Sequence, residues 1–126
     1  MRVIDADPTL AQRPVLDTSV SIRAHALAER LITDLTIGEL AFCLRQGIAL
    51  PQVAERAVAA LIEQPLVEAD GYPGDLLCSL LNAAESYGLP ALSESELFDI
   101  CSDALAAAKA VQELVVPATS AYVARR

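Results

Sequence analysis

Apolar side chains recur at helical spacing in five stretches of the chain: residues 18–33, 37–46, 51–64, 75–87 and 94–114. Apolar residues three or four positions apart line one face of a helix. A helix of this kind cannot bury its face alone, so several must pack together. We therefore predict an all-α fold, a compact bundle or orthogonal array of about five amphipathic helices.

Local signals mark the ends of the second and third stretches. Thr36 and Glu39 have the spacing of a capping box, which indicates a helix starting near residue 37. Gly47 suits the position just after a helix, where φ must be positive. Pro51 fits the first turn of the next helix, where its missing N–H costs nothing.

Similar signals bound the last two stretches. Pro73-Gly74 is typical of a type II turn, and Asp75 behind it is predicted to cap a helix. Ser93 and Glu96 have the spacing of a second capping box. The residues of the last helix expected to point inward are Leu97, Phe98, Cys101, Ala104, Leu105 and Ala108.

The two ends of the chain lack this periodicity. Residues 1–17 contain two prolines and are expected to form an extended or mobile lead-in. A helical domain is predicted over residues 18–114. Pro117 is expected to interrupt the helical pattern, and the sequence of tail residues 115–126 leaves a helix and a strand equally open.

Composition narrows the protein class. Hydrophobic residues make up 54% of the chain and aromatic residues only 4%. Such a hydrophobic fraction is too high for a disordered protein. No apolar run approaches the roughly 20 residues that span a bilayer. Acids stand in the first seven residues, where a signal peptide needs an apolar stretch. We expect a cytoplasmic protein.

Few residues of the types that carry catalysis or bind metals are present. The chain has one histidine and no glycine-rich phosphate loop. Glu68, Asp70 and Asp75 do not have the spacing of an EF-hand. The three cysteines lie far apart in the chain and are expected to be buried small hydrophobic side chains. We predict no enzyme, no cofactor and no metal site.

Charge is distributed unevenly along the chain. The formal net charge is −8, which disfavours nucleic acid and anionic membranes as partners. Residues 57–108 hold nine acids and no Lys, Arg or His. Two interpretations stay open: arginines of the first half fold back and neutralise this segment, or the segment forms an acidic face for a basic partner.

Two groups of residues are candidates for such a face. The first is a loop group before the fourth helix, with Glu68, Asp70, Tyr72 and Asp75. The second, here called the acidic stripe, runs along the start of the last helix: Glu94, Glu96, Asp99 and Asp103. Like charges four apart repel, and no basic residue one turn away relieves them. Local packing of Tyr72, capping by Asp75 and a solvated or arginine-paired stripe are the structural alternatives.

Four segments together resemble a known family. They are residues 35–40, 44–50, 61–66 and 71–77, the last reading Gly-Tyr-Pro-Gly-Asp-Leu-Leu. Their order and spacing are similar to those of the helical immunity proteins of bacterial contact-dependent growth inhibition systems. The resemblance covers about residues 33–85.

This resemblance implies a non-enzymatic, cytoplasmic protein that binds and blocks the toxic C-terminal domain of a large effector. Such toxins are often nucleases with basic grooves, and the acidic segment found independently suits such a partner. The two residue groups above are then the expected toxin-binding site. A helical scaffold or oligomerisation module is the alternative, and a homo-oligomer stays open.

Overall fold

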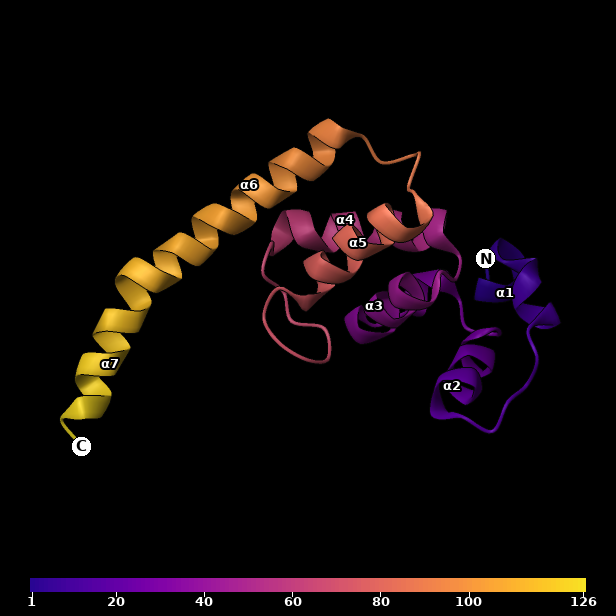
Figure 1. Ribbon diagram of the computed structural model, residues 1–126, viewed down its shortest axis with the longest axis horizontal. Helices are drawn as coiled ribbons and strands as arrows, with labels where there is room; N and C mark the ends of the chain where they lie inside the picture. Colours follow the sequence, from indigo (N-terminus) through magenta and orange to yellow (C-terminus); the bar gives the residue numbers. More distant parts are fainter.

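The computed structural model describes residues 1–126 and contains helices and no strands (Figure 1). The order of elements is α1 Val3–Ala6, η1 Pro8–Gln12, α2 Ser19–Leu27, η2 Ile32–Asp34, α3 Ile37–Gln46, α4 Leu50–Glu63, α5 Asp75–Tyr87, α6 Glu94–Ala110, η3 Val111–Val115 and α7 Val116–Ala124. The all-α prediction is confirmed. We call α1 to α5 the body of the protein; α6, η3 and α7 leave it as one extended helix.

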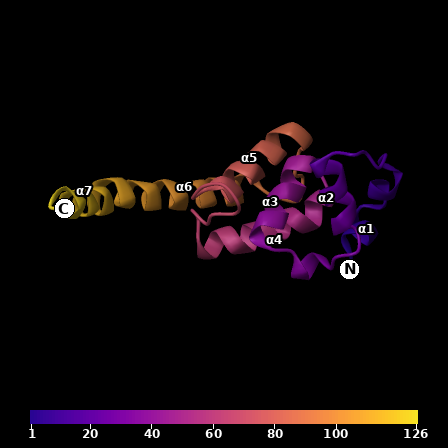
Figure 2. The same ribbon diagram turned by 90° about the horizontal axis from the view of Figure 1, so that it is seen from below.

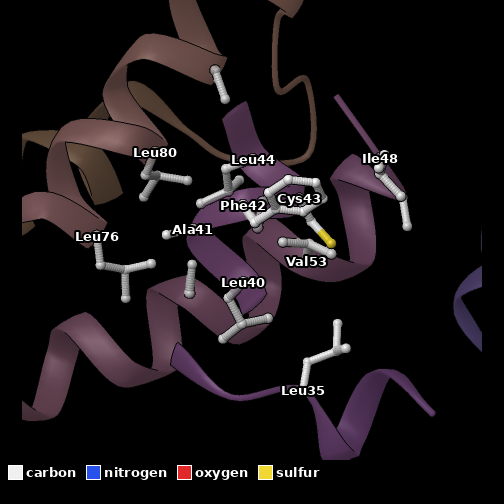
Figure 3. Close-up of a cluster of buried hydrophobic side chains, with 14 of the residues drawn as sticks. Leu35, Leu40, Ala41, Phe42, Cys43, Leu44, Ile48, Val53, Leu76 and Leu80 are labelled. Atoms are coloured by element: carbon white, nitrogen blue, oxygen red, sulfur yellow. The ribbon is translucent and has the colours of Figure 1, made fainter. Parts of the chain in front are cut away.

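The core is centred on α3, which packs against both α4 and α5. Five consecutive residues of α3, from Leu40 to Leu44, are buried. Side chains from the neighbouring helices, among them Val53 of α4 and Leu80 of α5, surround them (Figure 3). A helix buried on nearly all sides is what a central position in a small array requires.

The boundaries of α3 are those that its local signals predict. The Thr36 side chain accepts from the Glu39 amide, and the Glu39 carboxylate accepts from the Thr36 amide, so the capping box is complete. Gly47 ends the helix with φ at 69°. A Cβ at Gly47 would also lie 2.9 Å from the Tyr87 ring, so both backbone and space require glycine there.

The second capping box, at the start of α6, is half formed. The Ser93 hydroxyl accepts from the Glu96 amide over 3.1 Å, which fixes the predicted helix start. The Glu96 carboxylate does not return a bond to the Ser93 amide. The Glu96 side chain therefore stays exposed at the first turn of α6.

The N-terminal segment differs from the expectation. Residues 3–12 form α1 and η1 rather than an extended lead-in, with Val3 and Leu10 fully buried, whereas residues 13–17 lack helical structure. The amide of Val3 donates to the Arg30 carbonyl, and the amide of Ile32 to the Met1 carbonyl. These bonds take residues 28–32 out of the predicted helix 18–33, and α2 therefore ends at Leu27. Two buried side chains are too few to produce a visible period.

The C-terminal segment also differs. Pro117 does not interrupt the chain: α6, η3 and α7 continue as one helix over residues 94–124, here called the C-terminal rod (Figure 1). Proline in an α-helix clashes with the carbonyl four residues earlier. Here a wider π-helical turn over residues 111–115 precedes Pro117 and accommodates its ring.

The rod touches the body only near its start. Ile100 and Ala104 are buried there, while residues 108–126 are all exposed. Seen from a perpendicular direction, the rod still projects away from the body (Figure 2). Phe98 and Leu105, which we expected to point inward, are both 71% exposed. Only one flank of α6 meets the body, and these two side chains lie outside that flank.

The cysteines occupy three different environments. Cys43 is buried in the core and burial raises its pKa to about 11, whereas Cys78 is exposed and Cys101 is partly exposed. The expectation of buried side chains is thus wrong for Cys78, which lies on the outer face of α5. None of the helices has the length and apolar composition needed to cross a membrane.

These environments predict the order of thiol modification. A maleimide should modify Cys78 first in the native protein, and Cys43 only after unfolding, because the reactive species is the accessible thiolate. Mass spectrometry of labelled peptides measures the order. Labelling of Cys43 at the rate of Cys78 in native buffer would contradict the packing around α3.

Candidate functional site: the α4–α5 loop and the acidic stripe

The loop between α4 and α5, residues 64–74, is closed by backbone bonds. Glu68 and Pro73 form an antiparallel bridge, and the Gly74 amide donates to the Leu66 carbonyl. The predicted type II turn is confirmed: Gly74 has φ at 95°, and the Asp75 amide donates to the Tyr72 carbonyl over 3.1 Å.

Asp75 holds this loop from inside. Its carboxylate accepts four backbone amides, from Ala69 at 2.5 Å, Asp70 at 3.1 Å, Gly71 at 2.7 Å and Tyr72 at 3.3 Å. The residue is 4% exposed. The prediction that Asp75 caps α5 is wrong, because Gly74 is at that position and Asp75 turns back to the preceding loop.

The four amides also set the charge of Asp75. Burial alone would raise its pKa, but the amide donors outweigh burial and hold the pKa below its usual value. Asp75 is therefore an anion at neutral pH. A buried carboxylate that is fully bonded to backbone cannot present itself to a partner in this conformation, so Asp75 acts by shaping the loop.

Asp70 is the residue of the acidic segment that pairs with arginines of the first half of the chain. Its carboxylate lies 3.2 Å from the Arg45 guanidinium and 4.0 Å from that of Arg23. Arg45 also donates to the hydroxyl of Ser79, and Arg23 lies over the Phe42 ring at 4.4 Å. Asp70 thus joins the loop to α2 and α3, with part of its charge compensated.

Glu68 and Tyr72 are the loop side chains that face outward. Glu68 is exposed and has no ion-pair partner, and Tyr72 is 55% exposed. The nearby Cys78 thiol and the Asp75 carboxylate raise the pKa of Tyr72, so its phenol stays neutral and keeps its proton for donation. The loop therefore offers a carboxylate and an aromatic ring on a fixed backbone.

The acidic stripe carries four uncompensated charges. Glu94, Glu96, Asp99 and Asp103 are exposed, and none of them forms an ion pair with a Lys, Arg or His of this chain. The arginine-paired alternative for the stripe is therefore wrong. Among the nine acids of residues 57–108, only Asp70 pairs with a cation and only Asp75 is bonded to a set of amides.

The loop group and the acidic stripe are separate in the structure. The loop joins α4 and α5 at one end of the body, whereas the stripe runs along α6 as it leaves the body (Figure 1). The structure brings Glu68, Asp70, Tyr72 and Asp75 together in one loop. It does not bring the stripe into contact with them.

The sequence left open that arginines of the first half pair with the acidic segment, but it did not indicate which two arginines position the loop. Arg45 and Arg23 belong to helices that precede Asp70 by a long stretch of chain, and no local pattern indicates such a pairing. Sequence reasoning also missed a pocket of about 450 Å³ between α4 and the connector that precedes α6. Gln52 and Glu55 line it together with Glu96 of the stripe, and the Gln52 side-chain oxygen is buried without a partner.

No cluster of three or more His, Cys, Asp or Glu side chains is arranged to hold a metal ion. The fold and the loop define a small all-α protein with an exposed acidic surface. The sequence model of the CDI immunity proteins, CDI being contact-dependent growth inhibition, matches residues 7–91, and the chain belongs to this family. No curated protein and no solved structure matches the chain significantly.

Membership confirms the family expected from the four sequence segments. CDI immunity proteins are not enzymes; they bind cognate toxin domains. The matched region covers the body from Asp7 onward, including the whole α4–α5 loop but not α1, and ends just before the acidic stripe.

Proposed function

We propose that this protein neutralises a basic toxin domain, of the nuclease class, by covering it with the α4–α5 loop and the acidic stripe. The observation that carries the proposal is the charge left uncompensated over residues 57–108, where seven of nine carboxylates have neither a cation nor a set of amide donors. Charge of one sign on one region steers a partner of the opposite sign and excludes like-charged proteins.

The loop supplies the specific part of the proposed contact. Tyr72 is an exposed aromatic side chain beside Glu68, and tyrosines are frequent anchors of protein interfaces. Asp75 and Arg45 hold the backbone around it, so little ordering is required when a partner binds. This loop lies inside the region shared with the family.

The acidic stripe supplies the electrostatic part. Glu94 and Glu96 lie in the first turn of α6, where the helix dipole favours them. Asp99 and Asp103 gain no such stabilisation and repel each other, so their position is better explained by a basic partner than by helix stability. Nucleases bind phosphates through basic grooves, which is the chemistry that this stripe complements. On the same grounds we place the protein in the cytoplasm, where such a toxin would act.

The test uses the cognate toxin domain of this protein. The double substitution Asp99→Lys and Asp103→Lys should weaken toxin binding by roughly 10- to 100-fold, mostly through slower association at low salt. Calorimetry gives the affinity, and co-expression with the toxin gives the protection. Glu63→Lys with Glu85→Lys is the matched control, because these exposed acids lie on other helices and make no ion pair.

If the Asp99 and Asp103 variant keeps its toxin affinity and its helical circular dichroism, the stripe is not part of the interface. Equal losses in the variant and the control would show that net charge alone matters. A toxin domain with an acidic binding surface would contradict the proposal as a whole.

A further inference from the structure

The C-terminal rod lies entirely outside the region that the family match covers. The match ends at residue 91, and the rod spans residues 94–124, a length of roughly 46 Å at the rise of an α-helix. Most of it has no partner in the structure, and the body covers only Ile100, Ala104 and parts of their neighbours. Packing within one chain therefore leaves most of this helix uncovered.

Large apolar side chains are exposed along the whole rod. Phe98 and Leu105 are seven residues apart, so they lie on the same side of α6, and each is 71% exposed. Beyond the body, Leu114 is 70% and Val123 68% exposed. Monomeric proteins rarely leave so much apolar surface together in water. The remaining large apolar residues exposed on the rod are Val111, Val115, Val116 and Tyr122.

The two ends of the rod carry opposite charges. The start of the rod carries the four acids of the stripe and no cation, while Arg125 and Arg126 follow the last turn. Between them, Lys109 and Glu113 face each other at 3.9 Å. A second rod running antiparallel would place its basic end against the acidic end of the first, and the same contact would recur at the other end.

One register brings oppositely charged residues, and large apolar residues, of the two copies to the same height along the rod. If two rods cross at the level of Ala110, Glu94 lies level with Arg126 of the second copy, Phe98 with Tyr122, and Leu105 with Val115. Four of the residues around the crossing, Ala106 to Ala108 and Ala110, are small, so the two backbones can approach on the side of the rod away from Lys109. Bulky residues of the first half thus lie level with bulky residues of the second half.

We propose that the rod docks a second copy of this chain, antiparallel and related by two-fold symmetry. Such an interface uses the same patch on both copies, as closed dimers do. A standard interface takes roughly 800 Å² from each partner. Eight large apolar side chains of the rod, each at least 40% exposed, are available for such an interface.

The dimer uses a different flank of α6 from Asp99 and Asp103 of the proposed toxin contact. Asp99 and Asp103 are four residues apart on a flank that contains neither Phe98 nor Leu105. They stay accessible in the dimer, as does the α4–α5 loop on the body. Glu94, on the side of Phe98, then contacts the second copy. The dimer does not depend on what the toxin is.

The experiment is sedimentation velocity of the full chain at micromolar concentration, without toxin. We expect a dimer for the natural sequence. Two charge-reversed variants, Arg125→Glu with Arg126→Glu and Glu94→Arg alone, should each be monomeric or bind themselves at least about tenfold more weakly. An equimolar mixture of the two should form a heterodimer, because each acidic end then meets a basic end.

The mixture distinguishes a lost antiparallel contact from a folding defect, because misfolded variants would not dimerise when they are mixed. Leu105→Glu tests the apolar contact and should also give a monomer with unchanged helical circular dichroism, because Leu105 is 71% exposed. A monomeric natural chain would overturn the proposal, and so would a dimer unaffected by these variants. A mixture that stays monomeric would overturn the antiparallel arrangement.

Protection against the toxin is the second readout. The Arg125 and Arg126 variant should protect as well as the natural protein, because the proposed toxin contact includes neither residue. Loss of toxin binding in this variant, with a natural chain that is monomeric, would assign the rod to the toxin and overturn self-association. Failure of the acidic stripe to bind toxin, by contrast, leaves the dimer result unchanged.

Discussion

Replacing Asp75 with alanine should cost about 3 kcal/mol of stability, the largest effect expected of a single substitution in the α4–α5 loop. Four backbone amides would lose their common acceptor, and donors left unpaired are costly when buried. A loss of this size lowers the Tm of a domain of this length by roughly 10 °C. Thermal and urea unfolding followed by circular dichroism measure it.

Asp75→Asn is the matched control, since it keeps one acceptor oxygen and loses the charge. Its stability should fall between those of the natural protein and the alanine variant. Because the folded protein holds the pKa of Asp75 below its usual value, the stabilisation is complete above the unfolded pKa of about 3.9. It declines as pH falls through the lower folded pKa. The difference in unfolding free energy between the natural protein and the asparagine variant should therefore shrink below about pH 4. A constant difference would contradict this role.

Replacing Tyr72 with alanine should weaken toxin binding by roughly 30- to 100-fold, the loss typical of an aromatic anchor. The side chain is more than half exposed in the free protein, so its removal should change the unfolding free energy by less than about 1 kcal/mol. Surface plasmon resonance against the toxin domain and urea unfolding give the two values. A large stability loss with unchanged affinity would make Tyr72 a packing residue of the loop.

Tyr72→Phe separates the ring from the hydroxyl. If the ring provides the contact, the phenylalanine variant should keep most of the affinity. If the phenol donates a hydrogen bond to the toxin, as its neutral state at physiological pH allows, the two variants should lose similar amounts. Glu68→Gln on the same loop tests the neighbouring charge without changing shape.

Elements defined by local chemistry could be predicted closely from the sequence. The capping box at Thr36 and Glu39 and the positive φ at Gly47 need only neighbours in the chain, and α3 has the predicted bounds. The type II turn at Pro73-Gly74 is of the same kind. Prediction failed where non-local or irregular backbone structure decides the end of a helix. Hydrogen bonds with residues 1–4 end α2 early, and a π turn lets the helix continue past Pro117.

The candidate site could likewise be predicted only in part. The segment without basic residues is visible in the sequence, and so is the loop that carries Tyr72 and Asp75. The bonding partners of Asp75 are not, because an aspartate at a helix start can cap forward or bond backward, and loop closure decides between them. The pairing of Asp70 with Arg45 depends on how α3 and α5 pack, which composition does not specify.

Because Asp75 holds the α4–α5 loop through main-chain amides, the conformation of the loop does not depend on its outward-facing side chains. The loop conformation depends on a buried carboxylate and on main-chain amides, which every amino acid except proline supplies. Glu68 and Tyr72 can therefore be exchanged for other residues without altering the path of the chain. Under the toxin contact that we propose, a lineage facing a new toxin variant would change recognition at positions 68 and 72 while position 75 stays fixed, so retargeting would not require refolding.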